Sequence, residues 1–330
     1  MAVVAAVAEP ELQTVAVVIP VHNGARFLAQ TLDAVAAQTH AQLDVVLVDD
    51  GSTDDSESVA RATGLPLRWL RHTAARGVSC ARNTGLAAST APFVCFLDQD
   101  DVWHPRHIAT QLACFASHPE CSAVVSPYQH WYSGPEGHPS AASLWPADTG
   151  DATDPQFTGW VYHQFMLDCW ALTSATLLRR SALQAHGGFD ETLPYSEDWQ
   201  LWLRLSREVQ FAKLLGPPVL YRQHGVQGSR QARPVDYRCE LLLANAQAHG
   251  LASRDGRCIE RRIFDDTIAR YQADFGYHQL QFGNRGLGVR TLWRAWRRRP
   301  LAPRTLALAL AASVGWRPGT PRPGSTHVAP

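Results

Sequence analysis

Apolar runs and helical patterns alternate regularly through the first hundred residues, and this alternation constrains the fold more than any other feature. Continuous apolar runs are typical of strands that are buried on both faces of a sheet. Strands separated by helices form right-handed βαβ units, so we predict an α/β fold with a mostly parallel central sheet. The predicted strands cover residues 15–20, 43–50, 67–72 and 92–98, and the helices between them cover 25–38, 52–64 and 78–89.

The rest of the chain continues this pattern less regularly. A segment rich in proline, glycine, serine and aspartate, 133–155, predicts a long loop of the kind that often covers a site. Two short apolar runs, 209–215 and 218–224, look like paired strands. Further predicted elements are a helix at 106–117, a strand at 122–127, a strand and short helix within 173–193, a helix at 196–208, and helices from 232 to about 312.

Charge and cysteine content exclude some classes of protein. The 330 residues carry 30 basic and 30 acidic side chains, so the net charge of zero gives no overall attraction to nucleic acid. The seven cysteines have no CxxC or metal-ligand spacing, which is typical of core residues in a reducing compartment. The apolar start lacks a basic segment, and no apolar run reaches the roughly 20 residues of a membrane-spanning helix. We therefore predict a cytoplasmic protein.

Polar residues follow all four predicted strands, at 20–23, 48–52, 71–77 and 97–101. Parallel sheets bind ligands beyond the carboxyl ends of their strands, so we expect these residues to converge on one ligand. The sequence has no GxGxxG motif after the first strand and no GxxxxGKS or GxxxxGKT motif. Their absence disfavours a dinucleotide-dependent oxidoreductase and a P-loop NTPase.

The segment CFLDQDDVWHP places three carboxylates, Asp98, Asp100 and Asp101, within four positions at a strand end. One of them, Asp101, has a simpler interpretation as the cap of the helix that follows. Capping does not account for the other two, whose mutual repulsion a cation would offset. Oxygen ligands without a Cys/His cluster suit Mg²⁺ or Mn²⁺, and magnesium commonly binds through one or two carboxylates and substrate phosphates. The segment therefore predicts a metal–phosphate site.

Three other segments supply candidate ligands and a candidate catalytic group. VDDGSTDDS is typical of a tight turn before a capped helix, which leaves Asp49 and Asp50 free to accept from a base N–H or a ribose hydroxyl. In RGVSCARN, Arg76 and Arg82 are either ordinary residues of a helix start or cations that neutralise a diphosphate. In SEDWQLWL, Asp198 either complements the helix dipole or acts in catalysis.

Taken together, these segments resemble the family-two inverting glycosyltransferases with the glycosyltransferase A fold. The resemblance implies a Rossmann-like sheet and transfer of a sugar from a nucleotide-diphosphate sugar, usually a UDP-sugar, with inversion at the anomeric carbon. It also implies Mn²⁺ or Mg²⁺ as cofactor and a glycan or lipid-linked acceptor, in bacterial cell-surface polysaccharide synthesis. The matching segments, in order, are VVIPVHNGARFLAQTLDAVAAQT, LVDDGSTDDS, RGVSCARNTGL, FLDQDDVWHP, GGFDETLPYSEDWQLWLRL and YRQHGVQGS.

The resemblance also implies roles for individual residues. Asp98 matches the first aspartate of the family's DxD motif, beside the ribose and diphosphate, and Asp100 matches the second, which binds the metal. Asp198 matches the general base, with Glu197 as the next candidate. His224 lies near positions that meet the diphosphate or the metal. The expected nucleotide-binding residues, besides Asp98, are Pro20, His22, Asn23, Asp50, Arg76 and Arg82.

Two departures from the family pattern matter. The position of His22 is often tyrosine in the family, which bears on how the nucleotide base is stacked. No QxxRW motif follows Asp198, which disfavours a processive polysaccharide synthase. The alternative functions are a sugar-nucleotide pyrophosphorylase, which would need a lysine in the loop PVHNGARF, and a non-catalytic nucleotide-sugar binding subunit.

We predict four segments along the chain. They are a disordered N-terminal extension at 1–13, a glycosyltransferase A catalytic domain at 14–231, a C-terminal helical region at 232–316 and a disordered tail at 317–330. The stretch RTLWRAWRRRPLAPR concentrates arginine and tryptophan beside a short apolar run, and no acidic residue follows Asp274. Such a segment either binds the anionic inner face of the cytoplasmic membrane or packs on the catalytic domain with its arginines in water.

Overall fold

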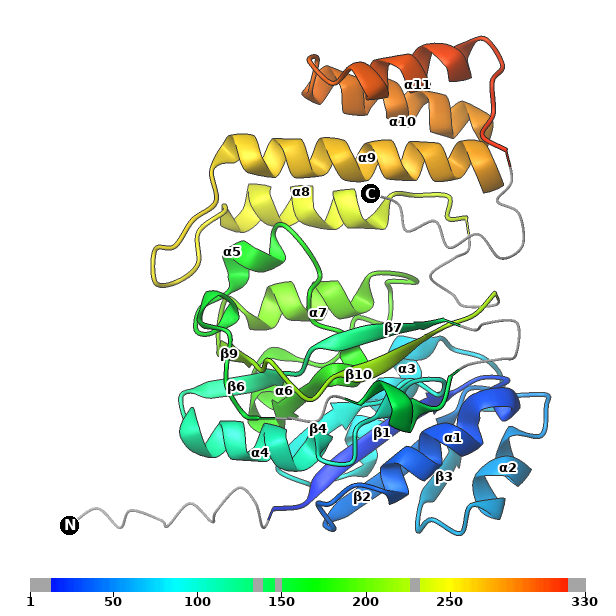
Figure 1. The fold of residues 1–330 in the computed structure, drawn as a ribbon, viewed down its shortest axis with the longest axis vertical. Helices are drawn as coiled ribbons and strands as arrows, with labels where there is room; N and C mark the ends of the chain where they lie inside the picture. Colours follow the sequence, from blue (N-terminus) through cyan, green and yellow to red (C-terminus); the bar gives the residue numbers. More distant parts are fainter. Residues whose placement is uncertain (1–12, 133–138, 146–149, 226–231, 320–330) are drawn as a thin grey trace. The chain divides into compact units, whose positions relative to one another are not determined.

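The computed structural model describes residues 13–132, 139–145, 150–225 and 232–319 (Figure 1). The chain forms two compact units, one of Met1–His224 with Ser253–Arg257 and one of Gly225–Ala252 with Cys258–Pro330. The predicted boundary at residue 231 lies outside the described residues, as do nearly all of the predicted extension and most of the predicted tail.

The first unit is built on a seven-stranded sheet with the order β3-β2-β1-β4-β8-β6-β9 (Figure 1). Strand β8 runs antiparallel to β4 and β6 and the other neighbouring pairs are parallel, so the predicted mostly parallel sheet is confirmed. Strands β2 and β4 lie on opposite sides of β1, which makes the carboxyl end of β1 the point where the strand order reverses. The strands are β1 (Val15–Val21), β2 (Leu43–Asp49), β3 (Arg68–Arg71), β4 (Phe93–Phe96), β6 (Cys121–Val125), β8 (Thr176–Arg179) and β9 (Gln210–Lys213).

Helices cover both faces of this sheet because its central strands are apolar on both sides. Alternate residues of β1, beginning with Val15, pack in one cluster with apolar side chains of α1 and α4. On the opposite face α3 lies against β1 and β2, where Val48 packs with Ala81. The helices of this unit are α1 (Ala25–Ala36), α2 (Ser56–Ala62), α3 (Val78–Ala88), α4 (His107–Ser117), α5 (Tyr162–Phe165), α6 (Arg180–His186) and α7 (Glu197–Leu205).

The two strands predicted to pair at 209–215 and 218–224 belong to different sheets, so that prediction is wrong. Strand β9 lies at the edge of the large sheet beside β6. Pro217 and Pro218 follow it, and proline lacks the amide hydrogen that a hairpin ladder uses. The next strand, β10, therefore joins a separate three-stranded sheet. That sheet has the order β5-β10-β7, with β5 (Val102–Trp103), β7 (Tyr128–Tyr132) and β10 (Val219–Gln223).

The predicted loop at 133–155 is only partly described. Residues 133–138 and 146–149 lie outside the described part of the chain. Between them, the indole of Trp145 packs edge-to-face on the imidazole of His104, with ring centroids 5.2 Å apart. Apolar side chains of this loop also pack against a buried cluster that includes Trp131 of the three-stranded sheet.

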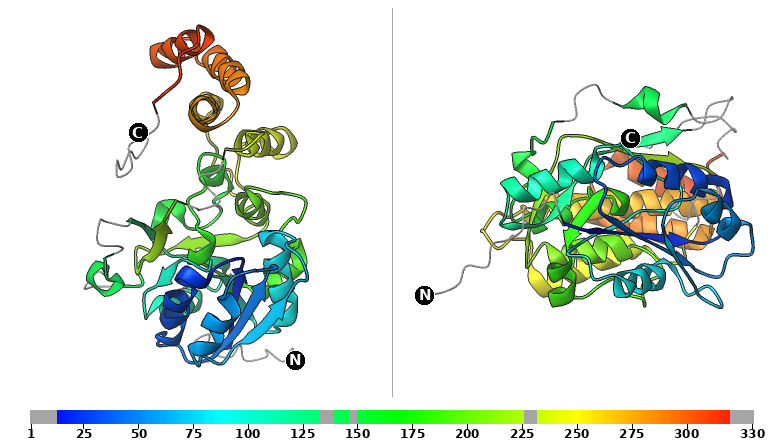
Figure 2. Two further views of the ribbon diagram at one scale, coloured as in Figure 1. Left: turned by 90° about the vertical axis from the view of Figure 1, so that its right-hand side faces the viewer. Right: turned by 90° about the horizontal axis from the view of Figure 1, so that it is seen from below.

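The described part of the second unit contains a stack of helices (Figures 1 and 2). Helix α9 contacts α8 on one side and α10 on the other, and α11 packs on α10. Helices α9 and α10 approach closely at two glycines, since a Cβ on Gly288 would lie 2.8 Å from the carbonyl oxygen of Gly276. Within the described residues, no helix has both the length and the apolar character that crossing a membrane requires. The helices are α8 (Tyr237–His249), α9 (Arg261–Phe282), α10 (Arg285–Arg298) and α11 (Pro303–Ser313).

We expect Gly85→Ala to destabilise the first unit, because α3 touches the sheet at this glycine. A Cβ on Gly85 would lie 2.3 Å from Cγ1 of Val18. Overpacking of a buried core costs about 1–3 kcal/mol, more than the ~1 kcal/mol that alanine gains over glycine inside a helix. A lower melting temperature and a lower urea midpoint should result. The control is Gly225→Ala, whose Cβ would have no neighbour within 4 Å among the described residues. Equal midpoints for the two variants would contradict this packing of α3.

Candidate functional site

Residues predicted for the site follow the carboxyl ends of β1, β2 and β4, and hydrogen bonds join these loops. The side chain of Gln99, after β4, accepts from the amide of His22 (2.8 Å) and donates to its carbonyl (3.1 Å). The Nδ1 atom of His22 lies 2.8 Å from the carbonyl oxygen of Asp50. Pro20 is buried within β1, two residues before His22. Three strand ends therefore form one connected surface.

The turn after β2 is held to the loop after β1 by its hydroxyl and amide groups. The amide of Asn23 donates to Oγ of Ser52 (2.9 Å), and Oδ1 of Asn23 accepts from the amide of Thr53 (2.8 Å). Asn23 has a left-handed φ of 51°, a conformation that asparagine tolerates better than most residues. These hydrogen bonds hold the turn in a non-helical conformation. Helix α2 therefore begins at Ser56 and not at the predicted Ser52.

Asp50 is a buried acceptor that organises the segment leading into α3. It accepts from the amides of Arg76 and Gly77 (both 2.8 Å), and its Oδ1 lies 2.7 Å from Nδ1 of His72. Burial alone would raise the pKa of Asp50, but His72 and the two amides outweigh burial and lower that pKa. Asp50 is thus not the free acceptor that the sequence predicted. The side chain of Arg76 is exposed, with Nη2 3.9 Å from Oε2 of Glu191.

Arg82 is a buried cation that joins two distant parts of the chain. It lies on α3 and is 3% exposed. Its guanidinium donates to Oδ1 of Asp98 (2.7 Å) and to Oε1 of Glu197 (2.9 Å). Burial alone would lower the pKa of Arg82, but Asp98 and Glu197 outweigh burial and raise that pKa. We call these three residues the Arg82 bridge. Because two carboxylates occupy the guanidinium, contact of Arg82 with a diphosphate stays a prediction.

Asp198 lies beside the Arg82 bridge in the first turn of α7. Its Oδ1 accepts from the amide of Trp199 (2.7 Å), whose indole donates to the carbonyl of Phe165 (2.8 Å). Burial and the charge of Glu197 raise the pKa of Asp198 to about 7, against the opposing effect of Arg82. A carboxyl group with a pKa near neutrality is well matched to proton transfer at physiological pH. Asp198 therefore stays the predicted candidate for the general base.

Asp101 is fully buried and supports the turn after β4. It accepts from the hydroxyl of Ser174 (2.6 Å) and from the amide of Arg222 (3.1 Å). Burial, together with neighbouring aspartates, raises the pKa of Asp101 well above its usual range. The alternative that Asp101 caps the next helix is wrong, because the cap position of α4 is Arg106.

Sequence reasoning missed Arg222, which holds the backbone of the acidic turn. This residue is 2% exposed, and its guanidinium lies over the rings of Phe27 (4.7 Å) and Trp131 (4.1 Å). It donates to the carbonyl of Asp100 (2.7 Å) and to Oε1 of Gln30 (2.7 Å). An arginine inside the apolar run VLYRQ was the available signal, since a buried charge needs partners. Gln99 was also missed, although it stands between the aspartates of the same segment.

Asp100 and His224 have the chemistry of a divalent-cation site. Oδ2 of Asp100 lies 2.7 Å from Nε2 of His224, and Nδ1 of His224 is buried without a hydrogen-bond partner in the described part of the chain. In the described ranges, no group of three or more His, Cys, Asp or Glu residues is placed to hold a metal. Mg²⁺ and related cations often take one or two protein ligands and complete their shell with water and substrate phosphates. The pair therefore fits a cation that arrives with its substrate.

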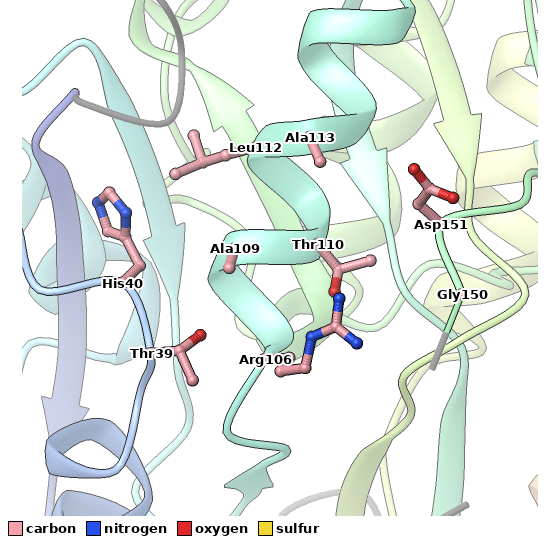
Figure 3. A pocket seen from close by; sticks show the side chains of 9 residues that line it. All are labelled: Thr39, His40, Arg106, Ala109, Thr110, Leu112, Ala113, Gly150 and Asp151. Atoms are coloured by element: carbon pink, nitrogen blue, oxygen red, sulfur yellow. The ribbon is translucent and has the colours of Figure 1, made fainter. Parts of the chain in front are cut away.

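A cavity of about 430 Å³ lies elsewhere on the first unit, beside the start of α4 (Figure 3). Residues just before β2 contribute to it, so it adjoins the amino end of that strand and not the carboxyl ends described above. No residue predicted for the site lines it. Its lining is Thr39, His40, Arg106, Ala109, Thr110, Leu112, Ala113, Gly150 and Asp151.

The sheet order, the reversal at β1 and the aspartates after β4 agree with the glycosyltransferase A fold that the sequence resemblance implied. Residues 16–175 match the family described as glycosyl transferase family 2, and residues 153–232 match a second family described as glycosyltransferase like family 2. The chain belongs to glycosyltransferase family 2.

Relatives by sequence carry glycosyltransferase names. An uncharacterized glycosyltransferase of Rickettsia bellii (strain RML369-C) is 25% identical over 242 residues, which are 69% of this chain and 32% of that protein. The amylovoran biosynthesis glycosyltransferase AmsB of Erwinia amylovora is 34% identical over 102 residues, which are 29% of this chain and 34% of AmsB. The matches span 32%, 58% and 37% of the first three curated relatives, so this chain corresponds to part of each.

Solved structures show the same fold. TarS 1-349 of S. aureus in complex with UDP-GlcNAc has a TM-score of 0.61 and 16% identity, covering 91% of this chain and 87% of TarS 1-349. The mannosyltransferase PcManGT of Pyrobaculum calidifontis, in complex with GDP-Man and Mn2+, has a TM-score of 0.54 and 18% identity. That match covers 93% of this chain and 81% of PcManGT.

We expect Arg82→Lys to destabilise the protein, because one ammonium group does not reproduce the fork that reaches both Asp98 and Glu197. Loss of a hydrogen bond to a buried charged group costs about 1.5–3 kcal/mol. Urea unfolding should show a loss of this size. The matched control is Arg61→Lys, since Arg61 makes an exposed pair with Glu57 at 2.7 Å, and such pairs contribute less than about 1 kcal/mol. Equal, small losses for both variants would show that the bridge contributes little.

Proposed function

We propose that this protein transfers a sugar from a nucleotide-diphosphate sugar, a UDP-sugar, to a hydroxyl of a glycan or lipid-linked acceptor. The reaction would invert the anomeric carbon. The observation that carries the proposal is the Arg82 bridge, which brings Asp98 at the end of β4 close to the start of α7, where Asp198 lies. Membership of family 2 supports the reaction class. TarS and PcManGT, solved with UDP-GlcNAc and GDP-Man, support a nucleotide-sugar donor.

Asp100 and His224 would hold the divalent cation, Mn²⁺ or Mg²⁺. When bound, such a cation neutralises negative charge on the departing diphosphate. Two contacts keep this pair in place. Nε2 of His224 lies against Asp100, and the guanidinium of Arg222 fixes the carbonyl of Asp100 from inside the protein. The rings of Phe27 and Trp131 pack on the guanidinium of Arg222. They thereby help to keep Arg222 in position beside Asp100.

The loops after β1 and β2 would form the nucleoside side of the site. The ring of His22 is exposed, and both of its nitrogens have neighbours, the carbonyl of Asp50 at 2.8 Å and Nδ2 of Asn23 at 3.3 Å. A ring held by both nitrogens keeps one orientation and can stack against a base. Asp50 binds the backbone of Arg76 and thereby presents the exposed Arg76 side chain for a phosphate. Asp98 lies between these loops and α7, where the sugar and diphosphate would meet.

Asp198 would act as the general base. An acceptor hydroxyl attacks the anomeric carbon from the side opposite the leaving diphosphate, and a carboxylate must take its proton. The attacking oxygen forms the new C–O bond as the bond to the diphosphate breaks, and the proton goes to Asp198. Its pKa of about 7 makes it basic enough to accept that proton and still largely ionised just above neutrality. Trp199 anchors the turn that carries it.

The acceptor would belong to cell-surface polysaccharide synthesis, and the reaction would take place in the cytoplasm. The likeness to the glycosyltransferase AmsB, named for amylovoran biosynthesis, supports a biosynthetic role for the sugar transfer. All seven cysteines lie in the described residues as free thiols, which is typical of a reducing compartment.

We expect Asp198→Asn to lower turnover by about 10²–10⁴-fold, the usual contribution of a general base. Binding of the donor should survive, because Asp198 lies outside the Asp100–His224 pair and the nucleoside loops. Release of nucleoside diphosphate from a panel of nucleotide sugars, with Mn²⁺ and candidate acceptors, measures turnover. Titration calorimetry with UDP and Mn²⁺ measures binding.

The comparison variant is Asp100→Ala, which should lose both metal-dependent donor binding and turnover. Asp100 follows β4 and Asp198 lies in the first turn of α7, and neither side chain belongs to the apolar core, so melting temperatures should stay close to that of the unaltered protein. Native turnover in Asp198→Asn would place the base elsewhere, with Glu197 as the next candidate. Binding of nucleotide sugar without any turnover in the unaltered protein would favour a non-catalytic binding subunit.

A further inference from the structure

Charge is divided unequally between the two units, although the whole chain is neutral. The second unit carries 15 arginines and 6 acidic residues, a net charge of +9, and the first unit carries the opposite charge of −9. The imbalance is strongest near the end of the chain, where no acidic residue follows Asp274. The positive charge of the second unit favours contact with surfaces of negative charge.

Four arginines of α10 lie on one exposed face. Arg290, Arg294, Arg297 and Arg298 are all exposed, and their spacing of four, seven and eight residues places them along one side of a helix. Nη1 of Arg298 lies 3.6 Å from Oδ1 of Asp265. Among the described residues, the other three have no carboxylate partner. Like charges four residues apart on a helix destabilise it, so an external anion would relieve this repulsion.

The neighbouring helix α11 presents an apolar strip that nothing in the described part of the second unit covers. Its buried face, with Ala309 and Ala312, packs in a cluster with Leu292 of α10. On the opposite face Leu310 is 51% exposed, and Val314, directly after the helix, is 88% exposed. We call Leu310 and Val314 the apolar strip. Leu301, in the turn between α10 and α11, is also exposed, at 94%.

We propose that the α10–α11 hairpin docks on the surface of an anionic membrane. Arg290, Arg294 and Arg297 would meet lipid phosphates, and the apolar strip would enter the boundary between headgroups and acyl chains. A soluble anion would satisfy the arginines and leave the strip in water, whereas an apolar protein partner would do the reverse. An anionic bilayer surface offers both kinds of contact at once. The proposal does not depend on sugar transfer, and its test contains no donor.

Flotation of the full-length protein with vesicles of phosphatidylglycerol and phosphatidylcholine tests this. Each arginine near an anionic surface contributes about fivefold to binding, so Arg294→Gln with Arg297→Gln should weaken binding about 25-fold. Leu310→Ser with Val314→Ser should weaken it about tenfold or more, by removing apolar contact. Binding of the unaltered protein should fall as salt is raised. Vesicles of phosphatidylcholine alone should recover little protein.

The matched control is Arg61→Gln with Arg254→Gln, which removes the same charge from exposed positions of the first unit and should bind like the unaltered protein. Melting temperatures of all variants verify folding. Equal recovery of the Arg294/Arg297 variant and the control would overturn the proposal, as would equal recovery with neutral vesicles. Competition by inorganic phosphate with no effect of the serine substitutions would assign the arginines to a soluble anion. A dimer in vesicle-free solution that the serine substitutions dissociate would assign the strip to a second copy of this chain.

Discussion

The buried guanidinium of Arg82 is the constraint on which the rest of the site depends. A charge with almost no exposure must be paired, and breaking a buried pair by removing one partner costs about 3–5 kcal/mol. The two partners of Arg82 lie in the turn after β4 and in the first turn of α7, so pairing this one cation fixes the position of one helix against the sheet. The position of Asp198 follows from this arrangement, because Asp198 is the neighbour of Glu197. The residue that anchors the fold here also determines where Asp198, the proposed general base, lies.

The aspartates of the site are chemically alike in the sequence, and their surroundings give them different properties. Amide and imidazole donors lower the pKa of Asp50, so it stays ionised and holds a loop. Burial raises the pKa of Asp101, which serves as an internal acceptor. Burial and the charge of Glu197 raise the pKa of Asp198 to about 7. When their surroundings separate the pKa values of carboxyl groups, chemically identical side chains can serve as acid, base or binding group in one fold.

Local pattern was enough to predict the framework and the edge of the sheet where the site lies. Continuous apolar runs identified β1, β2 and β4, and the polar residues that follow each strand, such as His22 and Asp98, lie at one edge as expected. Contacts between residues that are distant in the sequence could not be predicted from local pattern. Neither the contact of Arg82 with Glu197 nor the role of Arg222 has a spacing signature. The strand pairing at 209–224 failed for the same reason, since two adjacent apolar runs do not reveal that they enter different sheets.

The pH dependence of kcat/KM for sugar transfer, measured for the unaltered protein and for Glu197→Gln, tests the central claim most directly. This quantity reports the ionisation of catalytic groups in the free enzyme. In the unaltered protein it should rise with pH through about 7, as Asp198 loses its proton. Glutamine keeps the size of Glu197 and removes the charge that helps to raise the pKa of Asp198, so the rise should move to lower pH. A profile without a rise near neutrality, or a rise that does not move in Glu197→Gln, would contradict the account.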